Sequence, residues 1–213
     1  MQLTKYTHAC LVLKHNDIKI VFDPGGFSTD FSDFTQIDAV IITHEHPDHV
    51  NIDTVKEIIT SNPELLICTT KAVQESLKDH AIEAQAMMPG ERVMLNDVSL
   101  QFVGGTHAQI YDDVPAIDNL GVIVDDTLFV PGDSYFVPEQ KVDWLALPLN
   151  APWATIQQTV EFVKSVVPKH IFPVHDGLLS EVGHQIYGGN VQSHMPEGTT
   201  YQRIQLGETI SLA

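Results

Sequence analysis

The sequence contains little cysteine and no long apolar segment. Two cysteines, Cys10 and Cys68, in 213 residues allow at most one disulfide, which excludes a fold built on a disulfide framework. We expect both to be small buried side chains in a reducing compartment. No apolar run is long enough to span a bilayer, and the first five residues lack the apolar region of a signal peptide. These absences predict a cytoplasmic protein with no membrane partner.

Basic side chains are also scarce. Lys and Arg total 11 against 28 Asp and Glu, the formal net charge is −17, and only Arg92 and Arg203 are arginines. Binding to DNA or RNA requires a basic surface that releases counterions, so the composition argues against a nucleic-acid partner. Bound divalent cations would offset some of this charge locally, so a single small anion is still allowed as a ligand.

Linkers and low-complexity segments are absent from the sequence. Its composition, 43% hydrophobic and 18% charged with 12 Pro and 13 Gly, is typical of globular proteins. The length fits one domain that can bury a substantial core. We therefore expect residues 1–213 to form a single domain, and whether copies of it form a homo-oligomer stays open.

What the sequence does contain is a dense group of metal-ligand side chains. His44, His46, Asp48 and His49 occupy six positions directly after the apolar run 39–42, which predicts a buried strand. Neutral imidazole and ionised carboxylate are preferred donors for zinc, iron or manganese, and a short loop at a strand end can turn several of them toward one point. The alternative is a solvated turn, but a turn requires only Gly, Pro, Asn or Asp.

The rest of the chain alternates predicted strands with predicted helices. Apolar or β-branched runs predict strands at 11–13, 18–22, 65–68, 92–95, 98–103, 120–124, 127–130, 142–147 and 171–174. Helical spacing of apolar residues predicts helices at 51–60, 71–79 and 154–167, and residues 201–212 resemble a final hairpin. This alternation predicts a sheet with helices packed on its outer face.

Three more candidate ligands follow apolar runs at their carboxyl ends. They are His107 after Gly-Gly-Thr, Asp133 in Pro-Gly-Asp-Ser and His175 after Pro-Val. In layered α/β architectures, binding sites are built at strand ends. Each histidine alone could be an ordinary loop residue, but together with the 44–49 cluster they predict one shared site.

In order and spacing, these motifs resemble those of the metallo-β-lactamase superfamily, and Asp23 matches the early strand-end aspartate of that family. The segments 6–10, 147–149 and 172–175 further resemble the small metal-dependent hydrolases related to L-ascorbate-6-phosphate lactonase. Thr7 stands where that branch usually has glycine, and residues 150–153 depart from its Gly-rich form. These departures leave the substrate open.

The resemblance implies an α/β (α+β) fold, a four-layer αββα sandwich of two related halves, with two divalent metal ions in a cleft at one edge. It assigns His44, His46 and His107 to one metal, Asp48, His49 and His175 to the second, and Asp133 as a bridge between them. Zinc is the expected metal. Manganese and iron are alternatives, because an all-nitrogen and oxygen ligand set does not select among them.

Several residues around the metals have two interpretations. Asp23 would accept the free ring N–H of a ligand histidine, or would simply be an Asp-Pro turn residue. His8 would face the cleft as a catalytic hydrogen-bond donor, or would be a structural histidine. His184 could contact substrate from a C-terminal loop, as could His194, or both could be surface residues. Trp153 is expected in a pocket wall and Trp144 in the core.

The expected chemistry is hydrolysis of a small-molecule ester, lactone or phosphate ester. Two metals can hold a bridging hydroxide near neutral pH, because they lower the pKa of bound water from about 15.7 to about 7. Asp48 can orient this nucleophile and accept its proton. The walls of the substrate pocket are expected to come from loops at 24–36, 108–118, 134–141 and 176–200.

Other functions on the same scaffold fit less well. A di-iron oxidoreductase of the flavin-carrying type has Glu at the position of His46 and an added flavin domain, for which the chain has no spare length. Nuclease members carry an extra arm or an inserted domain, and glyoxalase-type thioesterases add a C-terminal helical domain. A non-catalytic metal- or ligand-binding protein remains the alternative from a different class.

Overall fold

The structure is a computed structural model, and it describes residues 1–212. The first part of the chain, together with the C-terminal strand β14, forms a seven-stranded sheet in the order β14-β1-β2-β3-β4-β5-β6. Its strands are β1 (Gln2–Lys5), β2 (Leu11–His15), β3 (Ile18–Phe22), β4 (Ala39–Ile42), β5 (Leu66–Thr69), β6 (Gln85–Ala86) and β14 (Thr209–Ser211). Strands β14 to β3 pair antiparallel, and β3 to β6 pair parallel.

A second seven-stranded sheet has the order β13-β12-β11-β10-β9-β8-β7. Its strands are β7 (Arg92–Leu95), β8 (Val98–Gly104), β9 (Leu120–Val124), β10 (Leu128–Val130), β11 (Trp144–Pro148), β12 (His170–Val174) and β13 (Thr200–Tyr201). Strands β7 to β10 are antiparallel and β10 to β13 parallel, so this sheet repeats the pairing pattern of the first. The two halves are therefore related, as expected.

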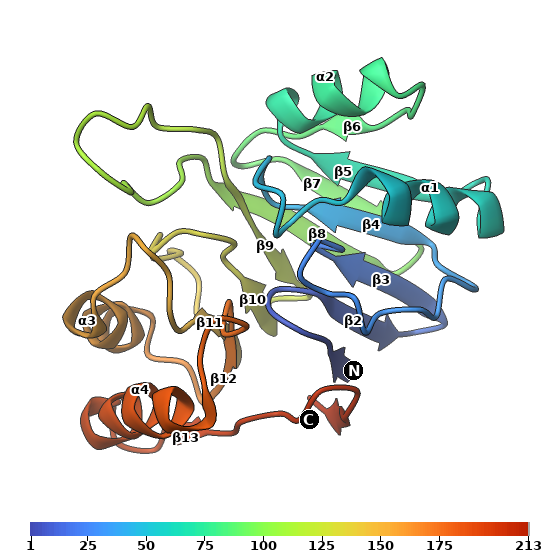
Figure 1. The fold of residues 1–213 in the computed structure, drawn as a ribbon. Helices are drawn as coiled ribbons and strands as arrows, with labels where there is room; N and C mark the ends of the chain where they lie inside the picture. The colour runs from blue at the N-terminus through green and yellow to red at the C-terminus, as the bar shows by residue number, and fades with distance from the viewer. Residues whose placement is uncertain (213) are drawn as a thin grey trace.

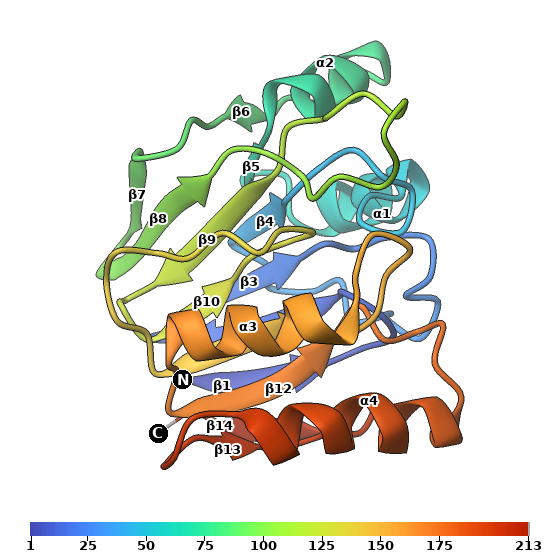
Figure 2. The same ribbon diagram turned by 90° about the vertical axis from the view of Figure 1, so that its left-hand side faces the viewer.

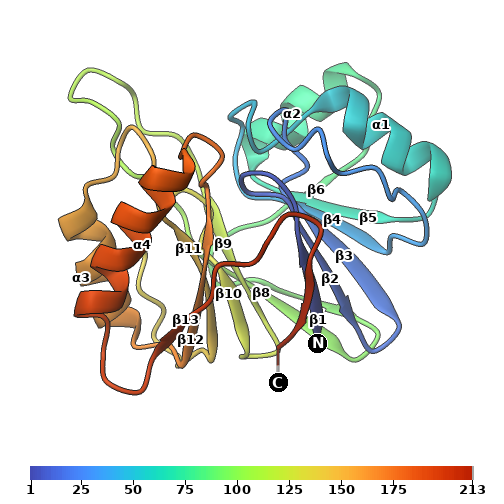
Figure 3. The ribbon, with the colours of Figure 1, turned by 60° about the horizontal axis from the view of Figure 1, so that its bottom comes forward.

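Four helices cover the outer faces of the sheets (Figure 1). Helices α1 (Ile52–Ser61) and α2 (Lys71–Asp79) lie on the first sheet, and α3 (Ile156–Val166) and α4 (Glu181–His194) lie side by side on the second. Figures 2 and 3 show the helices on the outside and the two sheets between them. The predicted four-layer αββα sandwich is confirmed.

Three apolar clusters fill the spaces between these layers. The largest lies between the sheets and includes Phe22, Phe102, Leu128, Val130 and Phe172. A second cluster joins the first sheet to α1 and α2, and a third joins the second sheet to α3 and α4. Both cysteines are free and buried, as expected, and burial raises the pKa of Cys68 to about 12. No helix within residues 1–212 is long and apolar enough to cross a membrane.

Two predictions for the C-terminal region were wrong. The tail does not form a hairpin, because β13 pairs with β12 in the second sheet while β14 pairs with β1 in the first. The expected loop 176–200 contains helix α4, which Ser180 caps by accepting a hydrogen bond from the Gly183 amide. Three glycines weaken its helical propensity, and only Gly188 and Val191 are buried, so the amphipathic pattern is faint.

Candidate metal centre

The predicted site residues lie at the carboxyl ends of strands from both sheets. These ends deliver, in chain order, His8 after β1, Asp23 after β3, the 44–49 loop after β4, His107 after β8, Asp133 after β10 and His175 after β12. Each of these strands except β8 is short, and most of their residues are buried. The chain can therefore turn at one common edge of the sandwich, where polar side chains from both halves meet.

The structure brings the eight candidate metal-binding side chains into two adjacent groups. The first group consists of His44, His46, His107 and Asp133, and the second of His8, Asp48, His49 and His175. Within each group, the ligand-type atoms lie within 4.8 Å of one another. Each group draws residues from both halves of the chain. The first group holds Asp133, which was predicted as a bridge, beside His44, His46 and His107, and the second holds His8 beside Asp48, His49 and His175. The metal that each residue would hold stays a prediction.

Asp133 contacts members of both groups. Its Oδ1 lies 3.1 Å from His49 Nε2, and its Oδ2 lies 2.9 Å from His175 Nε2 and 3.4 Å from His107 Nε2. The side chain is 2% exposed. This position, between the two groups, is the one that a bridging carboxylate requires.

Within residues 1–212, several buried polar atoms of the site make no contact with hydrogen-bond geometry, although oppositely charged groups lie near them. They are His49 Nε2, His107 Nε2, His175 Nε2 and Asp133 Oδ1. Buried polar atoms are nearly always hydrogen-bonded, so four unpartnered ones in one place call for an explanation. All four are nitrogen or oxygen donors of the type that bind divalent cations, and bound cations would satisfy them together. The residues present therefore fit a metal centre.

The opposite ring nitrogens of these histidines are each held by an oxygen. Nδ1 of His49 lies 2.8 Å from Asp23 Oδ2, Nδ1 of His107 lies 2.6 Å from the Ala108 carbonyl, and Nδ1 of His175 lies 2.7 Å from the Asn150 carbonyl. Since these oxygens only accept, Nδ1 carries a proton in each ring, and in the neutral ring the lone pair is on Nε2. The rings are thereby set in the form that binds a metal through Nε2.

Asp23 occupies the position expected for a carboxylate behind a ligand histidine. It is buried, and besides His49 it accepts from the Thr43 amide at 2.7 Å and from the Thr43 hydroxyl at 2.9 Å. The Thr43 hydroxyl, having donated to Asp23, can accept from His44 Nδ1 at 3.0 Å. One carboxylate thus orients two of the candidate ligands, which favours its predicted role over that of a turn residue.

Two residues that hold Asp133 were not identified from the sequence. Trp153 donates its indole N–H to Asp133 Oδ2 at 2.9 Å, and the Asn119 side chain accepts from the Asp133 amide at 3.0 Å. Trp153 was expected only as a pocket wall. A buried tryptophan needs an acceptor for its N–H, so a tryptophan close to predicted ligand loops could have been predicted to bond a ligand carboxylate. Asn119 precedes β9 with no local pattern that marks it.

Three of the strand-end residues adopt left-handed backbone conformations. The φ angles are 69° for His8, 44° for Asp23 and 54° for His175. Such conformations cost on the order of 1–3 kcal/mol for residues other than glycine, and they concentrate at functional sites. The surrounding hydrogen bonds hold the chain in these conformations at the site edge.

Electrostatics favour the ionised form of the carboxylates. Burial works against the charge of Asp133, yet His49, His107 and His175 hold its pKa well below the ordinary value. Burial lowers the pKa of His44 and of His46. Burial also opposes the charged form of His49 and His175, but Asp133 and Asp23 raise the pKa of His49 well above its ordinary value, and Asp133 and Asp48 raise the pKa of His175 to about 9. Without a cation these two rings favour the protonated form, and a bound cation would take the place of the Nε2 proton.

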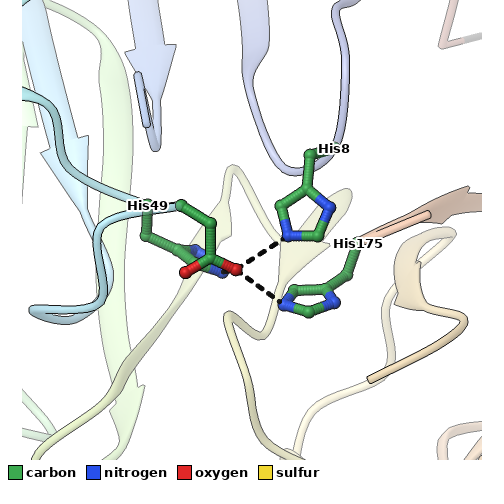
Figure 4. A group of neighbouring side chains, drawn as sticks. His8, His49 and His175 are labelled. Atoms are coloured by element: carbon green, nitrogen blue, oxygen red, sulfur yellow. Dashed lines mark hydrogen bonds and ion pairs between the residues drawn. The ribbon is translucent and has the colours of Figure 1, made fainter. Parts of the chain in front are cut away.

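His8, His184 and His194 lie in three different places. His8 is fully buried, with Nε2 2.9 Å from Asp48 Oδ2 (Figure 4). His184 lies outside both groups, in a cavity of about 230 Å³ that Lys5, His8 and Asp176 also line. His194 is exposed on α4 and bonds the Asn190 carbonyl. A substrate contact by His184 stays a prediction.

Neither arginine pairs with the metal-ligand groups in the described structure. Arg92 is exposed on β7 and donates to Gln101, while Arg203 pairs with Glu181 at the start of α4. Each guanidinium is therefore engaged by another residue, and an arginine clamp on a substrate phosphate is not formed by these contacts.

Comparisons with known proteins agree with this geometry. A family model described as a beta-lactamase superfamily domain matches residues 2–175. Protein Rv0786c of Mycobacterium tuberculosis is 33% identical over 196 residues, covering 90% of this chain and 91% of the relative. The solved structure of Igni18, a metallo hydrolase from Ignicoccus hospitalis, matches with a TM-score of 0.77 and 19% identity, covering 98% of this chain and 97% of its own.

Proteins with other activities share the fold. CmlA, a diiron beta-hydroxylase from Streptomyces venezuelae, matches with a TM-score of 0.75 and 16% identity over 98% of this chain and 53% of its own. Similarity at this level shows a common fold and leaves the reaction open. The family match over most of the chain, joined to the sandwich and its two ligand groups, leads to one conclusion: this chain belongs to the metallo-β-lactamase superfamily.

Proposed function

We propose that this protein is a metal-dependent hydrolase that holds two divalent ions and cleaves a small-molecule ester or lactone. The observation that carries the proposal is the set of buried, unpartnered donor atoms on His49, His107, His175 and Asp133. Bound cations would satisfy all four of these atoms together. The metallo hydrolase named among the structural neighbours supports the same class of reaction.

The chain's own residues have distinct roles in this proposal. His44, His46 and His107 would hold one ion, Asp48, His49 and His175 the other, and Asp133 would contact both. Two bound ions would supply an acidified water as nucleophile and a Lewis acid for the scissile carbonyl group. Asp48 is partly exposed, so its carboxylate can orient the water and accept a proton. Zinc is the proposed metal, with manganese or iron as alternatives.

Charge supports an ester or lactone over a phosphate ester. A bidentate arginine is the usual partner of a bound phosphate. Arg92 donates to Gln101, and Arg203, which lines the cavity beside His8, pairs with Glu181. Glu45, between the candidate ligands His44 and His46, is exposed and adds negative charge to the 44–49 loop. A substrate without negative charge avoids this repulsion.

The test combines metal analysis with a substrate panel. The purified protein, reconstituted in turn with zinc, manganese and ferrous iron, should bind two equivalents and hydrolyse members of a panel of lactones, aryl esters and phosphodiesters. His46→Ala should abolish turnover, whereas His194→Ala, on the exposed face of α4, should leave it unchanged. Two bound metals without turnover on the whole panel would instead favour a non-catalytic metal-binding protein. Oxygen consumption by the iron form would favour an oxidoreductase.

A further inference from the structure

His8 lies where a further protein ligand of the second metal would lie. Its Nε2 is 2.9 Å from Asp48 Oδ2, and its ring centroid is 4.0 Å from that of His175. Figure 4 shows the rings of His8, His49 and His175 gathered around one carboxylate. Distance alone therefore groups His8 with the candidate ligands. Hydrogen-bond direction separates it from them.

The proton on His8 lies on the opposite nitrogen from the one in the ligand histidines. The backbone N–H of Gly177 donates to His8 Nδ1 at 3.2 Å, so Nδ1 has a lone pair and no proton. A neutral imidazole carries one N–H, which must then be on Nε2. This N–H points at Asp48 Oδ2, which can only accept. His8 Nε2 thus has no lone pair to offer a metal, whereas His49, His107 and His175 keep a proton on Nδ1 and can free Nε2 for a metal.

Backbone contacts from the other half of the chain hold His8 in this orientation. The His175 amide donates to the His8 carbonyl at 3.0 Å, which fixes the main chain. A Cβ at Gly177 would lie 3.1 Å from His8 Nδ1 and 3.2 Å from His8 Cβ. Glycine is therefore the residue that lets the 177 amide approach the ring without displacing it.

We propose that His8 is a positioning residue and not a metal ligand: through Nε2–H it fixes the Asp48 oxygen that faces His49 and His175. This inference rests on the proposed metal centre. A carboxylate oxygen can accept this hydrogen bond with one lone pair and offer the other to a cation. The second ion then takes its protein ligands from Asp48, His49, His175 and Asp133, without His8. That leaves room for water and substrate, as a catalytic metal requires.

The decisive experiment is a measurement of the His8 tautomer by ¹⁵N NMR on histidine-labelled protein, with and without zinc. We expect a proton on Nε2 of His8 in both forms, and a proton on Nδ1 of His49, His107 and His175. A His8 ring with its proton on Nδ1 and zinc on Nε2 would overturn the proposal. Because this readout uses the wild-type chain, it does not depend on the folding of a variant.

Variants provide a second, independent readout. His8→Ala should retain two equivalents of zinc at saturation, with affinity lowered about 10- to 100-fold, as is usual for residues behind a ligand. His8→Gln, which keeps an N–H donor, should recover much of this loss. Loss of the second zinc equivalent in both variants, matching His175→Ala, would overturn the positioning role. Wild-type protein that takes up no zinc would refute the proposed function, while the His8 tautomer could still be read.

Discussion

At the scale of single residues, Trp153 is the clearest addition that the structure makes to the metal centre. Its indole N–H holds the Asp133 oxygen that faces His107 and His175. Trp153→Phe should therefore lower metal affinity about 10- to 100-fold with little effect on the fold. Isothermal titration with zinc measures the change.

Trp144 offers a matched control for this substitution. It is also a buried tryptophan, but its indole nitrogen has no hydrogen-bond partner within residues 1–212 and it lies in the core between the sheets. Trp144→Phe should leave metal affinity unchanged. Equal affinities for the two variants would show that the Trp153 hydrogen bond does not act on the metal centre.

Asp33 provides a test of pH dependence away from the site. Its Oδ2 lies 2.6 Å from Lys19 Nζ, and this hydrogen bond lowers the pKa of Asp33 from 3.8 to about 2. Because the folded-state pKa is depressed, the stabilisation is complete above about pH 4 and is lost as the pH falls toward 2. Asp33 is half exposed, so solvent screening keeps the contribution below about 1 kcal/mol.

Asp33→Asn should consequently destabilise the protein at pH 6 and have much less effect near pH 2. Urea unfolding of both proteins at several pH values measures the gap in unfolding free energy. A gap that is the same at all pH values would mean that the ionised pair contributes nothing.

At the scale of elements, the turn after β3 supports the metal-ligand loop through close backbone contact. A Cβ at Gly25 would lie 1.8 Å from the Asp48 carbonyl oxygen and 2.5 Å from the His49 amide nitrogen. Gly25→Ala must displace one of these segments. We expect a loss of about 1–3 kcal/mol of stability, the usual cost of overpacking, together with weaker binding of the second metal.

Gly189 in helix α4 is the control for this prediction. A Cβ there meets no atom within 4 Å, so Gly189→Ala should be neutral or stabilise by about 0.5–1 kcal/mol through helix propensity. Thermal unfolding and zinc titration on both variants give the comparison. Unchanged metal binding in folded Gly25→Ala would contradict the proposed support of the 44–49 loop.

At the scale of the whole molecule, each ligand group joins the two sheets. The first combines residues after β4 with residues after β8 and β10, and the second combines residues before β2 and after β4 with one after β12. A cation held by either group would therefore stabilise the packing of one half on the other. Metal binding should contribute to the stability of the entire fold.

Removing metal should lower the unfolding temperature of the reconstituted protein. Free metal at about 100 times the dissociation constant stabilises by about 2.7 kcal/mol per site, and each 1 kcal/mol shifts the midpoint by about 2–4 °C for a protein of this size. We expect EDTA to lower the midpoint by at least about 5 °C in calorimetry, and added zinc to restore it. A midpoint unaffected by EDTA in protein shown to lose its metal would refute this coupling.

The sequence by itself determined the fold class and the candidate ligands. Strand alternation, hairpin turns and the position of His107, Asp133 and His175 after apolar runs are local patterns, and local patterns are visible in sequence. Asn96 and Asp125 do take the positive φ angles that such hairpin turns need. The motif order then pointed to a single edge where these side chains meet.

Only the tertiary structure decided how those side chains are oriented. The proton position on His8 depends on Gly177, 169 residues away, and the orientation of Asp133 depends on Trp153. The short strands β13 and β14 pair in different sheets. Each pairing involves only two or three residues, so the strand that lies next to it in the folded protein determines the partner. Contacts between distant segments leave no local pattern in the sequence. The direction of these hydrogen bonds can therefore be assigned only from the folded structure.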